Sequence, residues 1–290
     1  MSEVKREDRG LLSVKAWVRM ILCIILSAVI MFSQAVGLAF FAEINVPPLF
    51  KTALAEIIPL LLAAVLMIAL GGFKWIGINK ESVVYAFKSG WIFPAFGVVL
   101  SIDRIIKSIS EKTPLADGFL LNMFGVILAC LLIGYFEEIL FRGVNLGNWL
   151  AILGSSKKLI MAAVLISAWN FGRIHVTSLS LDDPMVFVQS LLKIIQTGML
   201  GIVMSEIVMH TKKIGGAALL HATNDLMLML TGALFEGKSV SGVYVDNSET
   251  GKLTIVAYLI MIAVYLYPTT VSIKKLWKNY DEFYGPFVKD

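Results

Sequence analysis

Charged residues are scarce in this 290-residue chain. Asp, Glu, Lys and Arg make up 16% of it, hydrophobic residues make up 58%, and the mean hydropathy is +0.81. A soluble domain averages about 25% charged residues. So few charges cannot cover a globule in water, and the composition therefore predicts a protein whose main solvent is lipid.

The chain also has few cysteines and histidines, and its net charge is small. The only two cysteines, Cys23 and Cys130, lie inside apolar runs, which favours small core residues over a disulfide or a metal site. The net charge of +4 comes from 25 basic and 21 acidic residues without a basic stripe, which argues against a nucleic-acid partner. With only three histidines in the chain, the position of each one carries weight.

Apolar stretches of roughly 20 residues, the length that a bilayer core requires, divide the chain. They cover Trp17–Ala42, Thr52–Gly72, Val83–Ile102, Phe119–Phe141 with a possible continuation, Leu159–Val176, Met185–His210, Gly215–Phe235 and Leu253–Val271. The first stretch is far longer than the roughly 7–15-residue core of a cleavable signal peptide, so we expect it to be retained. The pattern predicts an all-α fold, a polytopic membrane helical bundle of about eight transmembrane helices that forms one integral membrane domain over residues 1–290.

The basic residues predict the orientation of this bundle. If the N-terminus is cytoplasmic, the inner flanks hold 17 Lys and Arg residues and the outer flanks hold 7, with Lys193 inside a span completing the 25. Cytoplasmic flanks normally carry the excess of Lys and Arg. We therefore expect cytoplasmic tails over residues 1–16 and 272–290, in what is expected to be a bacterial-type cell membrane.

The fourth span contains the densest group of ionisable residues, Glu137, Glu138 and Arg142. Such groups cost about 2.5–3.5 kcal/mol at the bilayer centre on insertion scales and usually have a task there. Glu138 and Arg142 have the i,i+4 spacing of a favourable ion pair. Because adjacent helical side chains point about 100° apart, the two glutamates are expected to serve different partners, which leaves Glu137 for chemistry. A pair that merely locks two helices together does not explain this second glutamate.

Two of the histidines lie in later spans. His221 and Asp225 are i,i+4, so the carboxylate can orient the imidazole ring. His175 and Glu137 lie at nearly equal distances from the turn Gly154–Lys158, so an antiparallel hairpin places them at one height. His221 shares that height if the hairpin tip projects about 15 Å into the cytoplasm. Either histidine alone is more often structural, but together they indicate a site.

A glutamate and two imidazoles suit two kinds of chemistry. They can deprotonate a water molecule and stabilise an oxyanion, as in a hydrolase. They can instead ligate zinc and leave a water at the open fourth position. The zinc-protease helix motif His-Glu-x-x-His is absent, and the spacing alone does not separate the two options.

With these pieces in order, the chain resembles the CPBP family, the CAAX-protease and bacteriocin-processing proteins also called Abi. The family pattern is Glu-Glu-x-x-x-Arg, then Phe-x-x-x-His, then His-x-x-x-Asn or His-x-x-x-Asp. This sequence has Glu137-Glu138 with Arg142, Phe171 with His175, and His221 with Asp225. The resemblance covers about 119–235 and implies an intramembrane endopeptidase related to type II CAAX prenyl proteases, acting on a membrane-associated peptide or protein.

The resemblance also implies a role for each residue. Glu137 and His175 are expected to activate the hydrolytic water, and His221 with its partner four residues later is expected to support the oxyanion. That partner is usually Asn in the prenyl-protein proteases, whereas here it is Asp225, with Asn224 one place earlier on another face. Because an ionised carboxylate accepts hydrogen bonds but donates none, Asp225 is expected to orient His221 instead.

Two other functions use the same residues. A non-catalytic immunity or signalling protein would bind a peptide in the same place, and a proton-coupled transporter would also use buried Glu and His. The transporter ranks last because the sequence shows neither similar halves nor broken helices. Other polar residues in the spans are expected to form interhelical hydrogen bonds, namely Glu56, Asn122, Lys193, Gln196 and Glu206.

Overall fold

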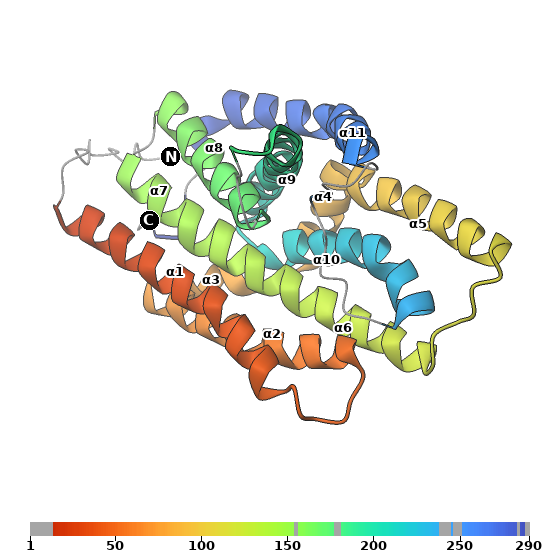
Figure 1. Ribbon diagram of the computed structural model, residues 1–290. Coiled ribbons are helices and arrows are strands. Elements are labelled where there is room, and N and C mark those ends of the chain that lie inside the picture. Colours follow the sequence, from red (N-terminus) through yellow and green to blue (C-terminus); the bar gives the residue numbers. More distant parts are fainter. Residues whose placement is uncertain are drawn as a thin grey trace.

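A computed structural model describes residues 14–153, 156–176, 181–237, 245, 251–282 and 285–287, and this part of the chain is helical without strands (Figure 1). Most of the predicted tail 1–16, the first two residues of the turn Gly154–Lys158 and parts of the tail 272–290 lie outside these residues. The helices are α1 Val14–Phe40, α2 Pro48–Ala69, α3 Phe73–Ile76, α4 Lys80–Gly90, α5 Ile92–Ser110, α6 Phe119–Glu138, η1 Ile139–Asn145, α7 Leu146–Leu153, α8 Lys157–Ile174, α9 Pro184–Thr211, α10 Ile214–Thr231, η2 Gly232–Glu236, α11 Gly251–Lys278 and η3 Tyr280–Glu282.

The predicted class, an all-α polytopic bundle, is confirmed. Within the described residues, six helices are long and apolar enough to cross a membrane, or seven if the bent pair α4 and α5 counts as one span. The predicted number of about eight is therefore too high. The fifth predicted span, Leu159–Val176, corresponds to α8, which has only 18 residues, carries Lys157, Lys158 and Arg173, and is not among these helices. The protein is therefore an integral membrane protein.

One predicted span differs in shape. The stretch Val83–Ile102 was expected to be a single helix, but the chain bends by 63° between α4 and α5. Pro94 explains the break, because it has no N–H to donate to the Gly90 carbonyl four residues earlier and its ring crowds that carbonyl. The expectation that no helix is broken is therefore wrong.

The fourth span is longer than a bilayer. Helices α6, η1 and α7 follow each other without a gap and form one continuous 35-residue span, Phe119–Leu153. At 1.5 Å per residue this span is about 52 Å long, well beyond the roughly 30 Å of a hydrocarbon core. This excess length is compatible with the projecting hairpin tip that the sequence predicts.

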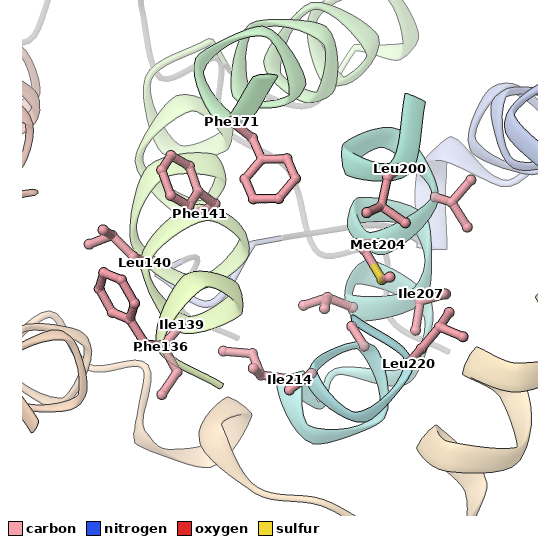
Figure 2. Close-up of a cluster of buried hydrophobic side chains, with 14 of the residues drawn as sticks. Phe136, Ile139, Leu140, Phe141, Phe171, Leu200, Met204, Ile207, Ile214 and Leu220 are labelled. Atoms are coloured by element: carbon pink, nitrogen blue, oxygen red, sulfur yellow. The ribbon is translucent and has the colours of Figure 1, made fainter. Parts of the chain in front are cut away.

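Helix α9 lies at the centre of the packing. Its residues 196–209 are all buried, and it packs against α8, α11 and α4. A second set of contacts joins α6 to α2 and to α10. Figure 2 shows the apolar cluster between these elements, to which Phe136, Phe141 and Phe171 contribute from α6, η1 and α8. The predicted site residues Glu137, His175 and His221 lie beside this cluster.

The outside of the bundle is apolar, as lipid contact requires. Large side chains of α1 are half or more exposed, among them Ile21, Leu22 and Phe32. The start of α1 and the end of α11 lie at the same end of the bundle (Figure 1). Arg19 lies 5.8 Å from the ring centroid of Phe287, which supports the same arrangement. Cys23 and Cys130 are both buried and free, as predicted.

Candidate active site

The two glutamates lie where α6 changes into a π-helix. Glu137 and Glu138 are the last residues of α6, and the π-helical η1 begins at Ile139. Such wider turns are rare and often occur at functional sites. Helices α6 and α10 approach closely here because Gly134 has no side chain: a Cβ on it would lie 2.6 Å from the Ala218 carbonyl oxygen. Ala218 is one turn before His221, so this contact brings His221 next to the glutamates.

Glu138 is completely buried and has two partners. Arg142 Nη1 donates to its Oε1 at 2.9 Å, so the predicted i,i+4 ion pair is present. His221 Nδ1 also lies 2.9 Å from Glu138 Oε1. Because an ionised carboxylate can only accept, His221 Nδ1 must carry the hydrogen of this bond. Glu138 thus fixes the tautomer of His221, a contact that the sequence did not reveal.

Glu137 lies between the two histidines. Its Oε2 is 3.9 Å from His175 Nε2 and 3.7 Å from His221 Nε2. This oxygen is buried and makes no hydrogen bond in the described part of the protein, although the side chain as a whole is 12% exposed. The expectation that adjacent glutamates serve different partners is therefore wrong. The His221 ring lies near both glutamates because its two nitrogens are on different edges: Nε2 faces Glu137 and Nδ1 faces Glu138.

The orientation of His175 is fixed by the backbone. Its Nδ1 lies 2.8 Å from the Phe171 carbonyl oxygen, and since a carbonyl only accepts, Nδ1 carries the hydrogen. In the neutral ring Nε2 then has a lone pair, which faces Glu137. Glu137 Oε2 and the Nε2 atoms of both histidines therefore come together at one place.

The Phe171 ring packs against the two histidines and Arg142. It is fully buried, its ring meets those of His175 and His221 edge to face at centroid distances of 4.8 and 5.7 Å, and Arg142 stacks on it at 4.0 Å. Figure 2 shows the rings of Phe171 and Phe141 next to each other, with their centroids 5.2 Å apart. These contacts explain why an aromatic residue precedes His175 by one turn.

Asp225 lies on the same side of His221 as Glu137. Its Oδ2 is 3.4 Å from His221 Nε2, and its Oδ1 accepts from Asn224 Nδ2 at 3.2 Å. The nitrogen that Asp225 approaches is thus the one facing Glu137, while the shorter contact at Nδ1 belongs to Glu138. Glu138 is therefore the principal carboxylate that orients His221, and Asp225 is a second acceptor at the site.

The predicted zinc ligands are Glu137, His175 and His221. One carboxylate oxygen and two imidazole nitrogens are suitable donors for zinc. However, the described residues include no group of three His, Cys, Asp or Glu side chains arranged to hold a metal ion. Zinc ligation by Glu137, His175 and His221 stays a prediction.

The fold and these contacts define an integral membrane helical protein with a glutamate and two histidines brought together between its helices. Residues 119–227 match the family model of the Rce1-like type II CAAX prenyl endopeptidases. The resemblance to the CAAX-protease family is thereby confirmed over this segment, which includes all eight residues of the candidate site. Over these residues the chain is similar to a family of membrane endopeptidases. No curated protein and no solved structure matches the chain.

Proposed function

We propose that the protein is an intramembrane endopeptidase in which Glu137 and His175 activate a water molecule for attack on a peptide bond. The observation that carries this proposal is the meeting of Glu137 Oε2 with Nε2 of both histidines, at 3.9 and 3.7 Å. These separations exceed a direct hydrogen bond, and a polar pair at such a distance is often joined through a water. Glu137 Oε2 and His175 Nε2 can accept the two hydrogen bonds that such a water donates.

The proposed reaction begins with proton transfer. Glu137 takes a proton from water as the water oxygen attacks the carbonyl carbon, and His175 Nε2 accepts the second hydrogen bond from the same water. When the tetrahedral intermediate collapses, the C–N bond breaks and the proton on Glu137 passes to the leaving amine. His221, held by Glu138 at Nδ1, is placed to donate from Nε2 to the oxyanion when both of its nitrogens are protonated.

The alternative functions make different predictions. A non-catalytic peptide-binding protein would keep its activity after Glu137→Gln, because the amide has nearly the shape of the carboxylate. The broken helix α4–α5 removes one argument against a transporter. The described residues include no second broken helix to match it, so the repeat that builds many transporter sites is not indicated.

The proposal is tested by comparing membrane proteomes from cells that make the wild-type protein, Glu137→Ala or His175→Ala. We expect the same uncleaved precursors to accumulate in both variants, although both are inserted at the wild-type level. Glu111→Gln is a matched control, since Glu111 is a glutamate that directly follows α5 and has 59% of its side chain exposed. Wild-type cleavage in either Glu137→Ala or His175→Ala cells would contradict the proposal.

Two properties of the reaction need separate tests. Elemental analysis of the purified protein and cleavage in the presence of a chelator test zinc: one equivalent of zinc and loss of cleavage support it. Synthetic peptides covering the identified cleavage site, with and without a prenyl group, test whether the substrate is prenylated. Cleavage of only the prenylated peptide would assign a CAAX-type substrate.

A further inference from the structure

A second group of buried polar side chains lies outside the candidate site, where α4, α9 and α11 meet. Glu206 of α9 is completely buried, and the hydroxyl of Tyr85 on α4 donates a hydrogen bond to its Oε1 at 2.5 Å. Lys275 Nζ of α11 lies 3.9 Å from the same oxygen, and it donates to the Tyr85 hydroxyl and to Ser89 Oγ, each at 3.1 Å. The interhelical hydrogen bond that the sequence predicts for Glu206 is therefore present.

Tyr85 is the centre of this group. Its ring stacks on that of His210, with the centroids 4.0 Å apart and the planes inclined by 13°. The Lys275 ammonium lies 4.7 Å from the centroid of the same ring. A hydrogen bond to a carboxylate is among the stronger ones, and a buried carboxylate that loses its donor is costly. These contacts therefore fix α4 to α9 and to α11 at one place.

Helix α4 depends on such contacts. It has only 11 residues, and the chain bends by 63° between it and α5. Most of the stability of a helix in a protein comes from its tertiary packing, above all when the helix is short. Helix α4 packs against α9, α10 and α11, so its position is set by these three neighbours.

Helix α4 and the turn before it in turn hold α10, the helix that carries His221. A Cβ on Gly216 would lie 2.3 Å from the Ser82 carbonyl oxygen, so the backbones of α10 and α4 are in contact. The Gly215 N–H also donates to the Gly77 carbonyl oxygen at 3.1 Å. His221 follows Gly216 by five residues on the same helix. A shift of α4 would therefore move His221 relative to the two glutamates of α6.

We propose that Tyr85 is a positioning residue of the peptidase: its bond to Glu206 holds α4, and α4 holds α10 so that His221 keeps its place at the candidate site. This inference rests on the proposed peptidase function. The partners of Tyr85 lie outside the candidate site, so its effect on the reaction passes through His221. Misplacement of a catalytic group by about 1 Å can cost about 100-fold in rate, so a small shift of this helix matters.

The test uses the full-length protein in lipid nanodiscs and a peptide that covers a cleavage site found in the proteome comparison. Tyr85→Phe removes only the hydroxyl and keeps the ring that stacks on His210. We expect kcat to fall about tenfold with KM changed by less than about threefold, because no substituted atom lies at the candidate site. Tyr267→Phe is the matched control: Tyr267 of α11 is 67% exposed, and its substitution should leave kcat unchanged.

A second pair of variants tests the same bond from the side of Glu206 if Tyr85→Phe does not fold. Glu206→Gln keeps an oxygen that accepts from the Tyr85 hydroxyl, whereas Glu206→Leu removes it. We expect Glu206→Gln to keep kcat within about threefold of wild type and Glu206→Leu to lose about tenfold. Equal kcat in these two variants would overturn the inference.

A double-mutant cycle separates the positioning of His221 from a general loss of structure. His221→Ala removes the residue through which Tyr85 acts, so in that background Tyr85→Phe should change kcat by less than about twofold. A merely structural role would give the same loss in both backgrounds. That result, or a wild-type kcat in Tyr85→Phe, would overturn the inference while the proposed function stands. Failure of the wild-type protein to cleave the peptide would overturn both.

Discussion

At the scale of single residues, the site depends on which ring nitrogen of each histidine is held by a hydrogen bond. Nδ1 of His175 and Nδ1 of His221 are both engaged, one by a backbone carbonyl and one by Glu138, so both Nε2 atoms face Glu137. This arrangement resembles the logic of a catalytic triad, in which a third group fixes the tautomer of the base. Glu138 has that orienting role here, which leaves Glu137 for the proposed reaction.

Because Arg142 pairs with the buried Glu138, its removal should lower the stability of the protein. Arg142→Met leaves Glu138 as an uncompensated buried charge, and such losses destabilise proteins by about 3–5 kcal/mol. We expect a clearly lower midpoint of thermal unfolding for the detergent-purified variant. Glu138→Gln combined with Arg142→Met removes both charges and should recover part of the loss. A wild-type unfolding midpoint in Arg142→Met would show that the ion pair contributes nothing to stability.

The sequence allowed much of the site to be predicted, but not its connections. The motif spacing and the equal heights about the turn brought Glu137, His175 and His221 together, and the i,i+4 rule gave the Glu138–Arg142 pair. The bond between Glu138 and His221 was missed because it joins positions 83 residues apart and depends on the close approach of α6 and α10 at Gly134. Hydrophobic periodicity does not report such a long-range contact.

At the scale of elements, the position of His175 depends on how closely α8 approaches α9. A Cβ on Gly172 would lie 2.4 Å from the Ile194 carbonyl oxygen, so the backbones of the two helices meet there. Gly172 is three residues before His175 and next to Phe171. The helix contact therefore places Phe171 against Arg142 and His221, and it places His175 next to Glu137.

Gly172→Ala is expected to separate α8 from α9 and to abolish cleavage, since a Cβ cannot lie so close to a backbone oxygen without a shift of the helix. Gly198→Ala is the matched control, because a Cβ at that position meets its nearest atom, the Ala168 carbonyl oxygen, at an ordinary 3.4 Å. Alanine also gains about 1 kcal/mol over glycine in helix propensity, so the control should be stable. Cleavage by the two purified proteins is the measurement, and equal activity of both would contradict this account of the helix contact.

The broken span is the element that sequence reasoning missed. Hydropathy averages over a window of about 20 residues and does not respond to a single hydrogen bond lost at Pro94. The proline itself was a signal, since a proline inside a helical pattern ends or kinks the helix. Pro59 and Pro268 are counted inside α2 and α11, so the residue alone does not fix the outcome.

At the scale of the whole molecule, the account requires both termini on one side of the membrane. Arg19 near the start of α1 lies close to Phe287, which agrees with six crossings, whereas seven crossings would place these residues on opposite sides. The excess of Lys and Arg predicts that this side is the cytoplasm.

A fluorescent protein that folds only in the cytoplasm, fused to the C-terminus, should therefore fluoresce, and an alkaline phosphatase fusion at the same point should be inactive. The same pair of reporters at the N-terminus should give the same result. An active phosphatase at either terminus would contradict the predicted orientation and would place the candidate site near the opposite face.

The central claim is that Glu137 is the general base of a peptidase. Its most direct test is cleavage of a precursor identified in the proteome comparison, by purified wild-type and Glu137→Gln proteins in liposomes of the same composition. A general base contributes about 10²–10⁴-fold to the rate. The account predicts that the wild-type protein cuts the precursor at one bond and that Glu137→Gln, equally folded, is slower by at least 100-fold. Equal cleavage by the two proteins would contradict it.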